Sequence, residues 1–306
     1  MSAEVALKIA TRKSPLALWQ AEEVQRRLAA TNVSSTLVKM TTQGDQRLDT
    51  ALSKIGGKGL FIKELQRGMM EGRADLAVHS MKDVPAEFPD GLHLSVVLQR
   101  EDPTDALVSN KYCSFDELPE GAVVGTCSLR RQCQMLHKRP DLRMLDLRGN
   151  VNTRLRKLDD GQFDAIVLAS AGLIRLGMTD RITARFPTEL MLPACGQGIV
   201  GVECKVDDDV TNAALAPLHD RDAADRVACE RSLNAHLGGS CSTPIAAYSE
   251  LTGDELHLQA LVGMPDGSKV LQASGMAARD DAVALGVSVA EQLFDAGADE
   301  IVSYFH

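Results

Sequence analysis

Arginine, hydroxyl and glycine residues gather at two places where the sequence predicts that a strand passes into a helix. The first segment, residues 124–131, reads VGTCSLRR, and the second, residues 147–154, reads LRGNVNTR. Helices are expected to begin near Ser128 and, with Asn150 as the N-cap, at Val151, so that unpaired backbone N–H groups would lie beside these side chains. Guanidinium groups bind carboxylates and phosphates in a bidentate manner. The two segments therefore predict a site for a small polyanionic ligand at the carboxyl ends of strands.

The basic residues of these segments stand out because the chain as a whole is acidic. Its formal net charge is −9, yet residues 126–157 contain nine basic and two acidic residues, whereas residues 251–306 contain two basic and nine acidic ones. For any single arginine, a solvated helix face remains an alternative. Their position at strand–helix junctions favours ligand binding for Arg130, Arg131, Arg148 and Arg154.

A second candidate site follows a short apolar run that predicts a buried strand. The sequence His79-Ser80-Met81-Lys82-Asp83 ends this run, and Pro85 disfavours helix in the residues before it. Asp83 could act as a fixed carboxylate, and an Asp83–Lys82 surface pair is the alternative. His79 is more typical of a packed, hydrogen-bonded histidine than of a catalyst.

Several function classes are excluded by composition and motifs. An acidic chain with 4% aromatic residues favours neither nucleic acid nor a membrane surface as a partner. The lysine of Gly56-Gly57-Lys58-Gly59 is followed by glycine, so the hydroxyl of a nucleotide-binding loop is missing. The N-terminal ten residues lack a signal-peptide pattern, and no stretch approaches the about 20 apolar residues of a spanning helix.

Cysteine usage indicates reduced thiols. The chain has seven cysteines, without a C-x-x-C pair, and the spacing of Cys229, His236 and Cys241 fits no zinc motif. The sequence therefore predicts a cytoplasmic protein without a metal site.

The elements that must position these residues alternate over most of the first 205 residues. Short β-rich runs and helical patterns follow one another, which predicts parallel sheets with helices on both faces. The expected strands are Ala6–Ala10, Val33–Thr41, Ala74–Val78, Leu92–Leu98, Val123–Gly125, Arg143–Leu147 and Ala165–Leu168. The expected helices begin at Ser14-Pro15, Leu60, Ser128 and Val151, and Gln43–Lys58 is expected to be a long loop. Polar Arg100–Pro103 is a candidate crossover between domains.

Beyond about Asp220 the pattern changes. A helix over Arg221–Leu237 is followed by three strand-like runs near Ile245–Tyr248, Leu256–Val262 and Lys269–Ala273, and then by a helix over Asp281–Ala296. Consecutive strands flanked by helices predict a small α+β unit.

Six separated motifs, in collinear order over nearly the whole chain, resemble the porphobilinogen deaminase family. They are residues 10–17 (ATRKSPLA), 56–61 (GGKGLF), 79–85 (HSMKDVP), 125–131 (GTCSLRR), 147–150 (LRGN) and 238–241 (GGSC). The resemblance implies an α/β fold with two lobes like those of type II periplasmic binding proteins and a small C-terminal α+β domain. The implied domains are residues 1–98 with 198–216, residues 104–192, and residues 221–306.

The resemblance also implies a reaction. Family members are transferases of heme and tetrapyrrole biosynthesis. They condense four molecules of porphobilinogen, with loss of ammonia, into the linear tetrapyrrole hydroxymethylbilane. The primer is a dipyrromethane held by a thioether, and Cys241 matches the attachment cysteine. A soft thiol suits addition to the electrophile formed when the aminomethyl group loses ammonia. Asp83 matches the catalytic aspartate.

The acetate and propionate groups of each pyrrole would account for the basic residues. The positions that match binding residues of the family are Arg12, Ser14, Lys58, Ser80, Lys82, Thr126, Ser128, Arg130, Arg131, Arg148 and Arg154. Cys127 departs from the usual serine, although its neighbours are kept. The family implies a monomer. The alternatives are a non-catalytic binding protein of the same two-lobed fold, which would not explain Cys241, and a phosphoryl-transfer enzyme, which would need a nucleotide loop.

Overall fold

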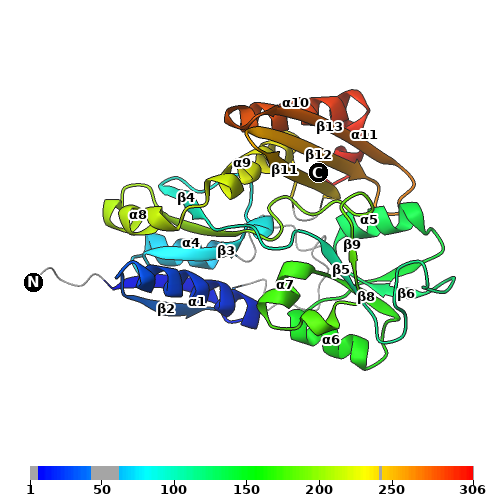
Figure 1. Ribbon diagram of the computed structural model, residues 1–306, viewed down its shortest axis with the longest axis horizontal. Helices are drawn as coiled ribbons and strands as arrows, with labels where there is room; N and C mark the ends of the chain where they lie inside the picture. Colours follow the sequence, from blue (N-terminus) through cyan, green and yellow to red (C-terminus); the bar gives the residue numbers. More distant parts are fainter. Residues whose placement is uncertain (1–5, 43–61, 241–242, 306) are drawn as a thin grey trace, which may run out of the picture.

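The computed structural model describes residues 6–42, 62–240 and 243–305, and these form three β-sheets with their helices (Figure 1). The first sheet lies at the left of this view and the second at the right, and the third packs above both. The expected loop Gln43–Lys58, including Lys58, lies outside the described residues, and so does Cys241, the cysteine predicted to carry the cofactor.

The first sheet has the strand order β2-β1-β3-β10-β4. Its strands are β1 (Leu7–Arg12), β2 (Ser35–Met40), β3 (Leu76–Ser80), β4 (Leu92–Val97) and β10 (Val200–Lys205). Helix α1 (Pro15–Ala30) buries Val24 and Leu28 against one face, which α8 (Asp209–Leu215) also covers, and α4 (Lys63–Met70) packs on the other. Ser14 caps α1, as predicted, because its side chain accepts the Ala17 N–H and proline occupies the first helical position.

The second sheet repeats this arrangement with the order β7-β6-β8-β5-β9. Its strands are β5 (Asp105–Val108), β6 (Val123–Gly125), β7 (Arg143–Leu145), β8 (Ala165–Ala169) and β9 (Ala184–Phe186). Helix α5 (Leu129–Lys138) covers one face, and α6 (Val151–Asp159) and α7 (Ser170–Arg175) cover the other.

The prediction of parallel sheets was wrong for one inserted strand in each lobe. β10 runs antiparallel to β3 and β4, and β5 runs antiparallel to β8 and β9. The chain enters each of these strands from the other lobe, not through a helix packed on the same sheet, so the parallel βαβ rule does not apply to them. The two crossings run between β4 and β5 and between β9 and β10.

The third sheet is antiparallel in the order β11-β12-β13. Its elements are α9 (Arg221–His236), β11 (Ile245–Thr252), β12 (Glu255–Gly263), β13 (Val270–Ala278), α10 (Ala282–Asp295) and α11 (Ala298–Ser303). Along β12, Leu256 and Leu258 face the helices, whereas Leu261 packs with Cys133 of α5 in the second lobe. The predicted fold class, two α/β lobes and a small C-terminal α+β domain, is confirmed. No described helix is both long and apolar enough to cross a membrane.

Candidate active site

Asp83 and Lys82 lie in a single 3₁₀ turn, Met81–Asp83, directly after the buried strand β3. The sequence predicted a non-helical segment up to Pro85, and this was wrong for the three residues of the turn. The turn ends at Val84, whose N–H donates to the Met81 carbonyl and whose backbone is extended, as a residue before proline requires. Both side chains are partly buried.

The Lys82 ammonium lies among charges from both lobes. Its Nζ is 3.4 Å from Oε1 of Gln197. Desolvation lowers the pKa of Lys82 to about 8, with repulsion from Arg131 acting in the same direction and attraction from Asp83 and Asp105 against it. A lysine with this pKa is mostly charged below about pH 8 and mostly neutral above it.

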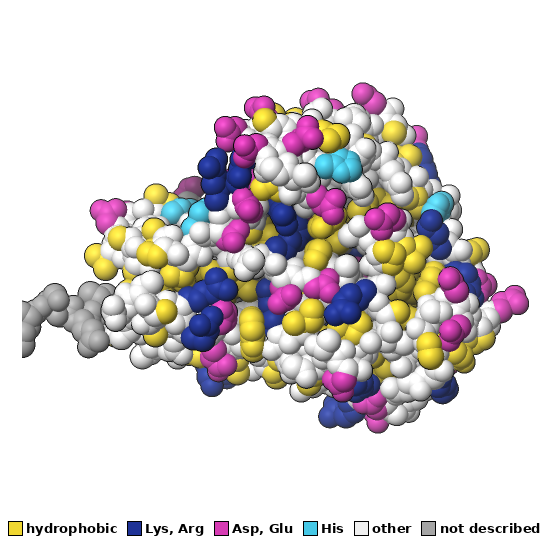
Figure 2. Space-filling view, viewed as in Figure 1, with side chains coloured by type: hydrophobic (Ala, Val, Ile, Leu, Met, Phe, Trp, Pro, Cys, Tyr) yellow, Lys and Arg dark blue, Asp and Glu magenta, His cyan; other side chains and the backbone are white. Residues whose placement is uncertain are grey.

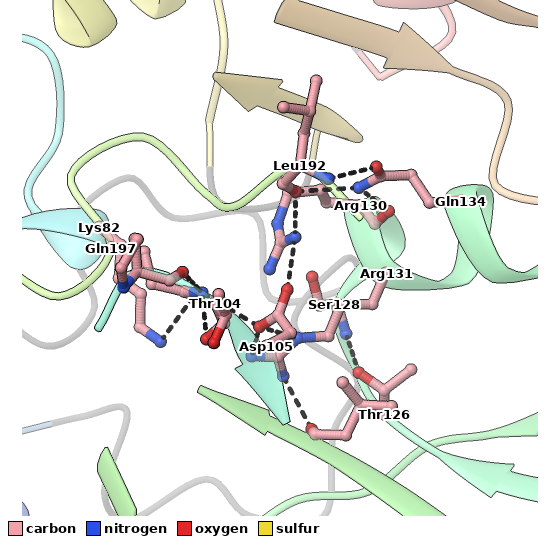
Figure 3. Close-up of polar contacts among 12 residues, drawn as sticks. Lys82, Thr104, Asp105, Thr126, Ser128, Arg130, Arg131, Gln134, Leu192 and Gln197 are labelled. Carbon is pink, nitrogen blue, oxygen red and sulfur yellow. Dashed lines mark hydrogen bonds and ion pairs between the residues drawn. The ribbon is translucent and has the colours of Figure 1, made fainter. Parts of the chain in front are cut away.

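Asp105, the first residue of β5, is the centre of a buried charge cluster that sequence reasoning missed (Figure 3). Its Oδ1 accepts from Nε and Nη2 of Arg131 at 3.0 and 2.7 Å, and Arg130 Nη1 lies 2.8 Å from its Oδ2. Burial by itself would raise the pKa of Asp105, but the two guanidinium charges outweigh it and hold that pKa well below the usual range. The carboxylate therefore stays ionised.

This cluster changes the expectation for Arg130 and Arg131. The exposed fractions of Arg130 and Arg131 are only 4% and 5%. Arg130 also donates to the Leu192 carbonyl at 2.6 Å, and Arg131 donates to the Val167 carbonyl at 2.9 Å. One carboxylate faces two guanidiniums, so the cluster keeps a net positive charge. Arg130 Nε is buried and finds no hydrogen-bond partner among the described residues. Direct contact of Arg130 and Arg131 with a ligand stays a prediction.

Arg154 connects the second lobe electrostatically to Asp83. The Asn150 side chain caps α6 by accepting the Thr153 N–H, as predicted, and Arg154 Nε donates to the Gly149 carbonyl at 2.8 Å. Burial lowers the pKa of Arg154; Cys127 and Asp83 oppose that change, while Arg131 and Arg148 add to it. The carboxylate of one lobe is thus within electrostatic reach of the guanidinium of the other.

The two predicted hydroxyl residues of the second lobe lie where β6 meets α5. Thr126 is fully buried, and its Oγ1 accepts the Ser128 N–H at 3.2 Å. Ser128 is the N-cap residue of α5, in agreement with the predicted helix start, although its own side chain makes no capping bond.

Three predicted residues of the first lobe lie at the carboxyl ends of β1 and β3. Arg12 ends β1 and is partly buried. Ser14 Oγ is 3.4 Å from the Ala17 nitrogen, and Ser80 Oγ accepts from Gln20 Nε2 at 2.8 Å. These hydrogen bonds give both serines a structural role.

Gln197 is a further residue that sequence reasoning missed. It is 1% exposed, and its Nε2 donates to the Pro103 carbonyl at 2.7 Å and to Asp105 Oδ1 at 3.1 Å, while its Oε1 faces Lys82. The signal was its glycine neighbours. Gly196 and Gly198 have φ of +69° and +88°, and a Cβ atom at either position would collide with neighbouring atoms. Such a tight crossing of the chain favours glycine.

Together, these contacts define a two-lobed α/β protein in which the Asp83 carboxylate and several cations lie where strands of both lobes end. Figure 2 shows basic and acidic side chains near the middle of one face of the molecule. Such a set of donors suits a ligand with several carboxylates.

The family model described as "Porphobilinogen deaminase, dipyromethane cofactor binding domain" matches residues 7–213, and the model of the porphobilinogen deaminase C-terminal domain matches residues 224–295. The chain belongs to the porphobilinogen deaminase family, and the predicted resemblance is confirmed.

Solved structures with similar folds are distant. They include a putative methionine-binding lipoprotein from Bacillus subtilis (12% identity, 73% of this chain and 94% of that chain, TM-score 0.44). Another is the periplasmic VFT2 domain of BvgS from Bordetella pertussis (16% identity, 75% of this chain and 95% of that chain, TM-score 0.42). A third is the lipoprotein Tp32 from Treponema pallidum (14% identity, 70% of this chain and 90% of that chain, TM-score 0.46).

Family membership establishes the reaction. The protein is a transferase with hydroxymethylbilane synthase activity, which condenses porphobilinogen into hydroxymethylbilane with a dipyrromethane cofactor, in porphyrin and heme biosynthesis. The described residues fit this cofactor, because its acetate and propionate groups require cations and the site offers buried guanidiniums, including the unpartnered Arg130 Nε.

Proposed function

We propose that Asp83 is the catalytic carboxylate, that Cys241 carries the dipyrromethane through a thioether, and that the surrounding cations bind its carboxylates and those of porphobilinogen. The observation that carries this assignment is a chain of contacts between the lobes: Lys82, next to Asp83, contacts Gln197 Oε1, and Gln197 Nε2 donates to Asp105, which also accepts from Arg131. A pyrrole held between the lobes would have its carboxylates bound on both sides and a carboxylate beside its ring.

Asp83 would act on the charge that develops in the reaction. Loss of ammonia from porphobilinogen leaves positive charge on the pyrrole. A fixed carboxylate near the ring N–H stabilises that cation more than the neutral ground state. Asp83 is held in a closed 3₁₀ turn, so it needs little reorganisation when the charge appears. It could also accept and return the protons that ring coupling releases.

The cations would fix the pyrroles in place. The proposed set comprises Arg12, Ser14, Lys58, Ser80, Lys82, Thr126, Ser128, Arg130, Arg131, Arg148 and Arg154. Asp105 orients Arg131 through two hydrogen bonds and leaves the pair with Arg130 cationic, so these guanidiniums are aligned before a ligand arrives. When bound, the dipyrromethane supplies the pyrrole carbon at which the chain is extended.

The domain division, the location and the oligomeric state are also proposals. We propose three domains, residues 1–98 with 198–216, residues 104–192 and residues 221–306, supported by the three sheets and by β10 in the first of them. A cytoplasmic monomer without nucleic-acid or membrane partners is supported by the acidic composition and by family expectation.

Arg154→Leu is expected to stall the reaction, because each lost charge-assisted hydrogen bond costs about 1.5–3 kcal/mol. The purified variant should accumulate as apoenzyme or as an early enzyme-bound intermediate, which intact-mass spectrometry resolves. Arg156→Leu, on the exposed side of the same helix, is the matched control and should give the wild-type mass distribution and rate. Wild-type masses and kinetics for Arg154→Leu would contradict the proposed binding role.

Lys82 should impose a pH dependence on substrate capture. An ammonium is charged below its pKa, so a pKa of about 8 predicts that kcat/KM falls as the pH rises through 8. Lys82→Arg stays charged over this range and should lose that decline, while ionisation of the substrate itself affects both proteins equally. A decline of the same size at the same pH in both proteins would show that Lys82 does not bind a carboxylate.

A further inference from the structure

Arg231 of α9 donates hydrogen bonds to the chain segment that follows the 3₁₀ turn of Asp83. Its Nη1 donates to the Val84 carbonyl at 3.1 Å, and its Nη2 donates to the carbonyls of Pro85 and Ala86 at 2.7 and 2.9 Å. The guanidinium also lies 5.4 Å from the ring centroid of Phe88. One side chain of the third domain thus holds three consecutive backbone groups of the first lobe.

This segment needs an external donor. It is irregular, with neither helix nor strand from Val84 to Pro89, and Pro85 has no N–H to contribute. Val84 follows Asp83 directly, and its N–H closes the 3₁₀ turn by donating to the Met81 carbonyl. The position of the Val84 carbonyl therefore constrains the backbone of Asp83. A planar guanidinium reaches three carbonyls in one geometry, which a lysine ammonium on a flexible stem does not reproduce.

The preceding residue, Glu230, fixes the same helix to both interlobe crossings. Its carboxylate accepts from Arg100 Nη1 at 2.6 Å and from the Gly196 N–H at 2.7 Å, and it is fully buried. Helix α9 thereby holds the crossings through Glu230 and the Asp83 segment through Arg231. Two adjacent side chains of the third domain thus link the segment that follows the 3₁₀ turn to both interlobe crossings.

We infer that Arg231 is a positioning residue for Asp83, which sets where the carboxylate lies relative to the cations of the second lobe. The inference rests on the proposed catalytic role of Asp83. Arg231 touches backbone carbonyls rather than the reacting groups, so its effect should fall on kcat and not on substrate affinity. Misplacing a reacting group by about 1 Å can cost about 10²-fold in rate.

The test compares Arg231→Met and Arg231→Lys with Arg279→Met, each as holoenzyme verified by intact mass. Arg279 is a matched control, because it pairs with Asp222 and Asp225 of the same helix but lies away from the Asp83 segment. Arg231→Met should lower kcat by about 10- to 100-fold with KM within about twofold, and Arg231→Lys should recover part of the rate. Arg279→Met should stay within about twofold of wild type in both constants.

A double variant separates positioning from general stabilisation. If Arg231 acts through Asp83, Asp83→Asn combined with Arg231→Met should be no slower than Asp83→Asn alone. If Arg231→Met does not fold, the same cycle with Arg231→Lys is decisive. The inference would be overturned if the losses in kcat from Asp83→Asn and Arg231→Met multiplied in the double variant. It would also be overturned if both Arg231 variants had the same kcat as Arg279→Met. Either result would leave the role of Asp83 intact. A near-normal rate for Asp83→Asn alone would instead overturn the proposed function.

Discussion

Asp83→Asn is expected to lower turnover by at least about 10²-fold, the cost of removing one preorganised charge-stabilising group. Asparagine keeps the size of the side chain and one of its oxygen acceptors, but it carries no charge to stabilise a pyrrole cation. The effect should appear in kcat, because carboxylate binding by the surrounding cations is unchanged. The measurement is the rate of hydroxymethylbilane formation by enzyme whose cofactor content has been established by intact mass.

A suitable control is Asp90→Asn, at an exposed carboxylate on the same connection between β3 and β4. It removes one negative charge from the same part of the chain without altering the 3₁₀ turn, and its turnover should equal that of the wild type. Similar rates for the two variants would remove Asp83 from the proposed mechanism.

Cys241→Ala is expected to abolish both the covalent cofactor and the activity, because no other residue is proposed to carry the dipyrromethane. The wild-type protein should be heavier than its sequence by two linked pyrroles. The peptide that contains Ser240 and Cys241 should hold the whole increment. A thioether is not cleaved by disulfide reductants, so the added mass should survive them. Intact-mass spectrometry and peptide mapping measure both properties.

Cys127→Ser is the companion variant, since it changes a partly buried thiol and restores the residue usual in the family. It should keep the added mass. Protein from cells poor in porphobilinogen would lack the cofactor, so each sample is incubated with porphobilinogen before weighing. A wild-type protein that then still has the bare sequence mass, or a Cys241→Ala protein that carries the increment, would contradict the attachment.

Local signals explain why much of the fold could be predicted. The side chains of Ser14 and Asn150 cap α1 and α6 by accepting the N–H of the residue three positions further on. Both partners of each capping bond thus lie in one short stretch of sequence, where the pattern can be recognised. The predicted strands corresponding to β1, β3 and β8 are apolar runs whose burial follows from composition. Six motifs in collinear order, among them those around Asp83, Arg131 and Cys241, indicated the family.

The pattern of the sequence did not predict three strands, β5, β9 and β10. β5 and β9 have four and three residues, and β10 pairs with β3 across a separation of more than 100 residues. Short strands carry little periodic signal, and an inserted antiparallel strand is selected by the two neighbours between which it fits.

The charges of the site show the same division. The sequence by itself determined that Arg130 and Arg131 begin a helix and that Asp83 follows a buried strand. It could not determine that Asp105, 26 residues before Arg131, neutralises part of their charge, or that Arg231 reaches the Val84 carbonyl across 147 residues. A residue type specifies which bonds a side chain can make, but the partner is set by which segments the packed sheets bring together. Burial then makes an unpaired charge too costly to leave, so the tertiary structure decides which arginines are held by the protein and which charge remains for a ligand.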